Sequence, residues 1–116
     1  MTLVILYQIA VIYLAYKNAE MIYNDEPINH TNNALLHLLA AAIVLPSGLV
    51  NSISLLLLTR IVFDFALNFF RGYSLGYVSP RPASKIDKIE KKLFGNNGYL
   101  PKAIYLAALI AINIIW

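Results

Sequence analysis

Long apolar runs alternate with short polar links along this chain of 116 residues. Runs of about 15 to 21 mostly apolar residues have the length of helices that enter or cross a bilayer. The links between them are rich in Gly, Pro, Asn and Ser, which favour turns. The pattern predicts an all-α fold with a single membrane domain, residues 1–116. Its four transmembrane helices are expected over residues 3–23, 33–47, 51–71 and 101–116.

A break at Pro46, Ser47 and Gly48 divides residues 34–70, which are otherwise almost continuously apolar. As one helix this stretch would be roughly 55 Å long, well beyond a hydrocarbon core of about 30 Å. We therefore predict a tight hairpin at the break, preceded by a short second helix. A kinked helix or a re-entrant pair is the alternative.

The link between the third and fourth apolar runs contains a short amphipathic segment, predicted as a helix over residues 84–94. Ser84 is a suitable N-cap with Asp87 at the capping-box position, and the glycines that follow would end the helix. Asp87 and Glu90 are assigned to its solvated face. A basic helix of this kind lies either on the membrane surface or across the cytoplasmic end of its own bundle.

Composition supports a membrane protein, because 59% of the residues are hydrophobic and only 13% are charged. Soluble domains carry about 25% charged residues. Seven of the nine Lys and Arg residues lie between Arg71 and Lys102, so the positive-inside rule makes the 71–102 loop cytoplasmic and both termini external. Residues 3–23 lack the basic start of a signal peptide and are expected to remain as the first membrane helix. The expected location is a bacterial inner membrane or a viral membrane.

A stripe of polar residues marks the third apolar run: Arg60, Asp64, Asn68 and Arg71. On a helix these positions fall within about 80° of one another. A charge at bilayer depth costs roughly 3 kcal/mol on insertion scales, so this stripe must face protein or water and needs partners.

The predicted topology supplies candidate partners in the same leaflet. Lys17 and Glu20 lie at the cytoplasmic end of the first helix, and His37 lies just inside the start of the second. We therefore predict a polar cluster that faces the cytoplasm and binds a small ion, an anion or a lipid headgroup. Its candidate members are Arg60, Asp64, Asn68, Arg71, His37, Lys17 and Glu20. In the alternative interpretation, Arg60 and Asp64 neutralise each other and only fix helix packing.

The function favoured by this cluster is that of a small transport or channel-like protein. Four short helices leave little room for a pore within a single copy of the protein, so we expect a homo-oligomer in the lipid bilayer. The net charge of +3 is too small and too local to favour nucleic-acid binding. No catalytic motif or cofactor site is found, and His30 and His37 lack metal-ligand spacing, so no metal site is predicted. An intramembrane enzyme or binder acting on lipid headgroups is a less favoured alternative.

A resemblance to known proteins rests on two stretches, FDFALNFFRG and SKIDKIEKKLFGNNGYLPK. Through them about the last half of the chain resembles small membrane proteins of Bacteroidota and their phages. The resemblance implies a phage or prophage origin and assigns no activity. It adds a further alternative, an accessory protein that assembles in the host membrane or perturbs it as holins do.

Overall fold

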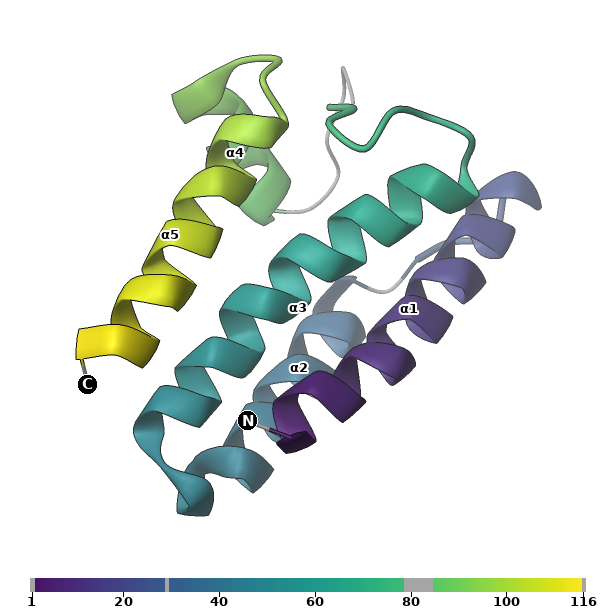
Figure 1. The fold of residues 1–116 in the computed structure, drawn as a ribbon. Coiled ribbons are helices and arrows are strands. Elements are labelled where there is room, and N and C mark those ends of the chain that lie inside the picture. Colours follow the sequence, from purple (N-terminus) through teal and green to yellow (C-terminus); the bar gives the residue numbers. More distant parts are fainter. Residues whose placement is uncertain (1, 29, 79–84, 116) are drawn as a thin grey trace.

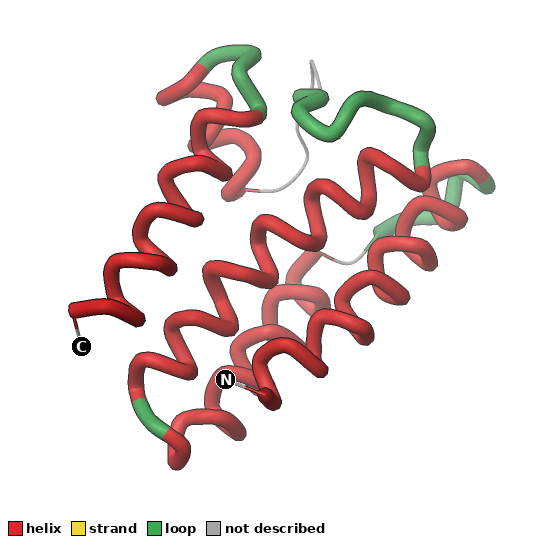
Figure 2. The backbone as a smooth tube through the Cα atoms, in the orientation of Figure 1, coloured by secondary structure: helices red, strands yellow, loops and turns green. Residues whose placement is uncertain are grey.

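The computed structural model describes residues 2–28, 30–78 and 85–115. All the regular secondary structure in these ranges is helical. The prediction of an all-α fold is confirmed (Figure 1, Figure 2). The five α-helices of these ranges are α1 (Thr2–Tyr23), α2 (His30–Val44), α3 (Leu49–Phe70), α4 (Lys85–Phe94) and α5 (Tyr99–Ile115). A 3₁₀ turn, η1 (Leu45–Ser47), joins α2 to α3.

Helix α3 is central, because α1, α2 and α5 all pack against it (Figure 1). A small apolar core lies between the first three helices, formed by Val4, Ala41, Val44 and Leu55. Leu55 and Val4 are fully buried there. The central helix therefore carries Arg60, Asp64 and Asn68 of the polar stripe, and Arg71 directly follows its last residue.

The break after α2 is a hairpin and not a kink. Helices α2 and α3 pack side by side, and the Ser52 Oγ donates a hydrogen bond to the Ala41 carbonyl oxygen at 2.8 Å. The chain reverses through η1 and Gly48, whose φ of 132° is disfavoured for residues with a side chain. Pro46 suits the first turn of η1, since it has no N–H to leave unpaired.

A sharp turn joins α4 to α5, with Gly95 directly after α4 and Asn97 two residues before α5. Gly95 has a φ of 64° and donates its N–H to the Lys91 carbonyl oxygen at 2.8 Å. The Asn97 Oδ1 accepts hydrogen bonds from the backbone N–H groups of Tyr99 and Leu100 and so caps α5. The two helix axes bend by 103° at this turn. The expected N-cap of α4, Ser84, lies outside the described residues.

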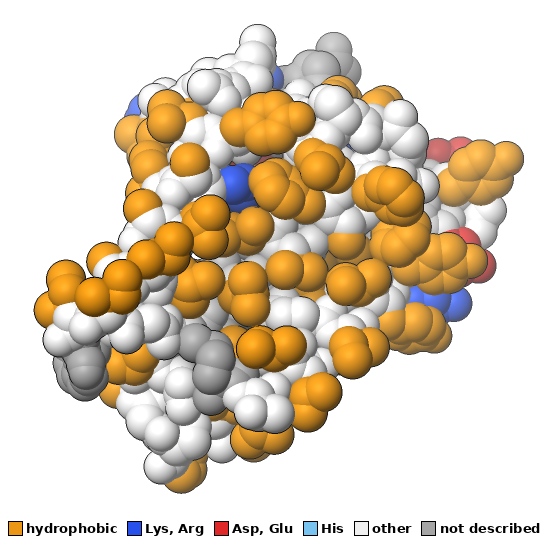
Figure 3. Space-filling model, viewed as in Figure 1, with side chains coloured by type: hydrophobic (Ala, Val, Ile, Leu, Met, Phe, Trp, Pro, Cys, Tyr) orange, Lys and Arg blue, Asp and Glu red, His pale blue; other side chains and the backbone are white. Residues whose placement is uncertain are grey.

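Large apolar side chains cover much of the outer surface (Figure 3). The exposed fraction is 68% for Ile9 and 69% for Ile43. In water such a surface would favour aggregation, whereas in lipid it has an apolar surrounding. The exposure therefore fits contact with a bilayer.

Within the described ranges two helices, α1 and α3, are long and apolar enough to cross a membrane, at 22 residues each. A third candidate span arises if α4 and α5 form one broken span. Helix α2 has 15 residues and α5 has 17, so each is shorter than the roughly 20 residues of a full span. Length and hydropathy thus support two to three spans, where the sequence pattern predicts four.

The position of the apolar core between the first three helices can be tested by substituting two neighbouring leucines, one buried and one exposed. Leu55→Ala should lower the free energy of unfolding by about 2–5 kcal/mol, because Leu55 is fully buried and its removal leaves a cavity. Leu56 is 36% exposed, and Leu56→Ala should cost clearly less. Unfolding in detergent micelles, followed by circular dichroism, measures both. Equal losses would contradict this position of the core.

Candidate functional site: an ion network joining α3, α4 and α5

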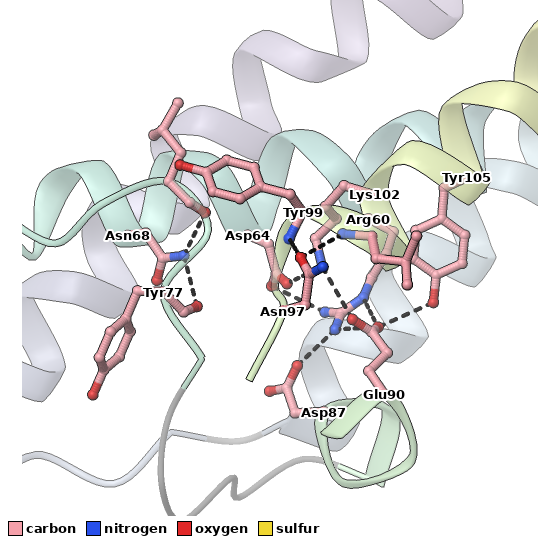
Figure 4. A network of polar contacts seen from close by, with 12 residues as sticks. Arg60, Asp64, Asn68, Tyr77, Asp87, Glu90, Asn97, Tyr99, Lys102 and Tyr105 are labelled. Carbon is pink, nitrogen blue, oxygen red and sulfur yellow. Dashed lines mark hydrogen bonds and ion pairs between the residues drawn. The ribbon is translucent and has the colours of Figure 1, made fainter. Parts of the chain in front are cut away.

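Arg60, near the middle of α3, binds three carboxylates at once (Figure 4). Its Nη1 donates to the Asp64 Oδ1 at 3.0 Å, one helical turn away. Its Nη2 donates to the Asp87 Oδ1 and to the Glu90 Oε2, both at 2.6 Å, and its Nε donates to the same Glu90 oxygen at 2.9 Å. The planar guanidinium offers several donors in one fork, which suits it to several acceptors.

Lys102, in the first turns of α5, closes the arrangement from the other side. Its Nζ lies 2.6 Å from the Asp64 Oδ2 and 3.0 Å from the Glu90 Oε1. The Tyr105 hydroxyl donates to the Glu90 Oε2 at 3.0 Å. Each oxygen of Asp64 and of Glu90 therefore has a partner, and Glu90 binds side chains from both α3 and α5. We call Arg60, Asp64, Asp87, Glu90 and Lys102 the ion network.

Most of the ion network is shielded from solvent. The exposed fraction of the side chain is 6% for Lys102, 11% for Glu90 and 18% for Arg60. Burying charges is unfavourable unless they are paired and fully hydrogen-bonded, and this arrangement meets that requirement. The five members carry two positive and three negative charges, so their formal net charge is −1.

A cavity of about 90 Å³ with both polar and apolar lining residues adjoins the ion network. This is room for a few water molecules, since one needs roughly 10–15 Å³ on the same measure. The cavity lies among α3, the loop after it, α4 and the turn before α5. The polar and charged residues that line it are Asp64, Asn68, Arg71, Tyr77, Asp87, Glu90, Lys91, Asn97 and Lys102.

The loop after α3 is held over this cavity by Asn68. Its Nδ2 donates to the carbonyl oxygens of Leu75 and Tyr77, at 2.9 and 3.2 Å. The same loop meets the turn before α5 at two glycines, because a Cβ on Gly98 would collide with the Gly76 carbonyl group. Only glycine allows backbone segments to approach so closely.

The polar stripe divides into two parts. Arg60 and Asp64 belong to the ion network, whereas Asn68 binds the loop backbone. Arg71 lines the cavity and lies over the Tyr73 ring, 4.9 Å from its centroid. All four residues therefore lie along one side of α3, as their spacing predicts.

The three other candidate residues do not join the ion network. Lys17 and Glu20 pair with each other on α1, 3.3 Å apart, with about half of each side chain exposed. The His37 Nδ1 shares a hydrogen bond with the Tyr7 hydroxyl at 2.8 Å, and its ring packs edge-on against Phe63. The structure therefore does not bring these residues into contact with Arg60 and Asp64, whose partners come from α4 and α5.

Sequence reasoning missed the carboxylates of α4. Asp87 and Glu90 were expected on a solvated face, yet Glu90 is 9% exposed and both bind Arg60. A signal was present, because they are the only two acidic residues after Asp64, in a segment with seven basic ones. Two positive charges in apolar runs, Arg60 and Lys102, need acidic partners, and few candidates exist.

Among the described residues, no group of three His, Asp or Glu side chains is arranged to hold a metal ion. Comparison with protein families, with curated proteins and with solved structures finds no match. The function therefore has to be argued from the site itself.

The contribution of Glu90 to the ion network can be tested by measuring the free energy of unfolding of variants. Glu90→Ala should lower the free energy of unfolding by about 3–5 kcal/mol, because Arg60 and Lys102 would lose a buried partner. The matched control is Glu20→Ala, which removes an exposed partner of Lys17 and should cost about 0–1 kcal/mol. Unfolding by sodium dodecyl sulfate in mixed micelles compares the two. Losses of equal size would contradict the role given to Glu90.

Proposed function

We propose that this protein is a small integral membrane transport protein that binds a proton at the ion network and passes it along the α3–α5 interface. The observation that carries the proposal is the composition of the ion network, which holds three carboxylates against two basic groups, with Asp64 and Glu90 largely shielded and Asp87 40% exposed. Ionisable residues within membrane helices commonly serve ion pathways and proton relays.

The charge balance favours a cation over the anion that the arginines alone would suggest. Uptake of one proton by a carboxylate would bring the formal charge of the network from −1 to zero. An added anion would make the formal charge of the network more negative and would have to displace a carboxylate from Arg60 or Lys102. Water in the adjoining cavity would connect the carboxylates to the cytoplasmic side.

A second polar contact supports a path along α3 and α5. Nearer the other end of this interface, the Asn113 Nδ2 donates to the Ser54 Oγ at 2.9 Å. Ser54 is fully buried, whereas Asn113 is exposed. Polar side chains therefore occupy both ends of the interface between these two helices.

The membrane arrangement is part of the proposal. In it α1, α2, α3 and α5 all enter the bilayer, α4 lies at the cytoplasmic interface, and the basic 71–102 loop is cytoplasmic. The short helices α2 and α5 would need a thinned bilayer or a protein neighbour. The proposed unit is a homo-oligomer in a bacterial inner membrane or a viral membrane, because a second copy would supply such a neighbour.

Proton flux into proteoliposomes tests the proposal. The purified protein is reconstituted with a pH-sensitive dye inside the vesicles, and a potassium gradient with valinomycin imposes an inward driving force. The intact protein should acidify the lumen. Glu90→Gln and Asp64→Asn should each slow acidification at least roughly tenfold, because a side chain that can accept the proton is lost.

The control is Glu20→Gln, which removes a carboxylate outside the ion network and should leave the flux unchanged. Circular dichroism of each reconstituted variant separates loss of flux from loss of fold. Flux no greater than in empty vesicles, or flux preserved in folded Glu90→Gln, would overturn the proposal.

A further inference from the structure

Helix α4 has three distinct faces. Asp87 and Glu90 face the bundle and bind Arg60. A second face is apolar and turned outward, with exposed fractions of 50% for Ile86, 58% for Ile89 and 68% for Leu93. The third face is basic and also exposed, and it consists of Lys85, Lys88 and Lys92.

The two exposed faces adjoin each other. At about 100° per residue, the three apolar side chains fall within about 60° of the helix circumference, and the three lysines occupy a neighbouring arc of similar width. The acidic pair occupies the remaining side. Because both acidic residues are engaged by Arg60, the outer surface of α4 presents lysines beside isoleucine and leucine.

The position of α4 is set by its contacts with α3 and α5. Its axis is bent by 103° from that of α5, which packs along α3. The turn between α4 and α5 contacts the loop that follows α3, through Gly98 and Gly76. Helix α4 therefore lies beside the middle of α3 and the first turns of α5, with its axis steeply inclined to that of α5 (Figure 1).

We propose that the outer surface of α4 binds anionic phospholipid of the surrounding bilayer, with Ile86, Ile89 and Leu93 in the acyl region and Lys85, Lys88 and Lys92 at the headgroups. Helices that lie in the plane of a bilayer interface have this combination of an apolar face and a basic face. Each lysine near an anionic surface is attracted to it, and the attraction adds over the three.

This inference rests on insertion in a membrane and not on proton transfer. Charge complementarity carries it, because both acidic side chains of α4 are bound to Arg60, whereas Lys85, Lys88 and Lys92 are exposed beside its apolar face. A zwitterionic lipid would satisfy the apolar face alone. The distinguishing expectation is therefore a preference for anionic headgroups that depends on the lysines.

A fluorescent label on α4 tests this preference. The chain has no cysteine, so Ile89→Cys allows a single environment-sensitive dye to be attached in the full-length protein. The protein is reconstituted in vesicles of phosphatidylcholine with or without phosphatidylglycerol, and nitroxide-labelled phosphatidylglycerol is titrated in as a quencher. Nitroxide-labelled phosphatidylcholine serves as the matched quencher.

We expect the anionic quencher to act at lower mole fraction than the zwitterionic one, by at least about tenfold. The triple substitution Lys85→Gln, Lys88→Gln, Lys92→Gln should remove that difference, and so should high salt. Lys17→Gln should preserve it, because Lys17 lies on α1. A dye at Ile43→Cys, an exposed site on α2, should show no preference.

Equal quenching by the two lipids, or a preference that survives the triple substitution, would overturn the proposal. The three lysines are exposed, so the variants should keep the fold, which circular dichroism checks. A failure of proton flux in the vesicle assay would leave this result unaffected, since the quenching measurement needs only the inserted protein.

Discussion

Arg60 imposes the constraint on which the arrangement of the C-terminal half depends. It lies within the more apolar of the two long candidate spans, and its charge is costly there unless carboxylates reach it. Asp64 on the same helix supplies one, and α4 must fold back to supply Asp87 and Glu90. The third and fifth helices are then joined by Lys102, which binds carboxylates of both α3 and α4.

The same constraint explains the unusual orientation of α4. An amphipathic helix on a soluble protein turns its apolar face inward, whereas α4 turns its acidic face inward and leaves Ile86, Ile89 and Leu93 exposed. In a membrane this orientation is favourable, because lipid accepts the apolar side chains and the bundle accepts the carboxylates. Helix α4 thus forms a wall of the cavity and, in the proposed membrane arrangement, also a surface toward the bilayer.

The helices were largely predictable from the sequence, and the partners of the stripe were not. Apolar periodicity located the runs that become α1, α2, α3 and α5, and Pro46 with Gly48 indicated the hairpin. The spacing of Arg60 and Asp64 predicted that they share a helix side. Lys17, Glu20 and His37 were plausible partners by depth alone, but periodicity does not say which helix faces meet. That depends on packing between segments far apart in the chain.

The sequence by itself determined that a charged stripe would lie on an apolar helix and would need compensation. This follows from residue spacing and from the free energy of placing a charge in an apolar medium. Only the tertiary structure decided that the compensation comes from Asp87, Glu90 and Lys102. Their side chains reach Arg60 and Asp64 because the chain turns sharply at Gly95 and Asn97, and a 103° bend between two helices is a property of three-dimensional packing.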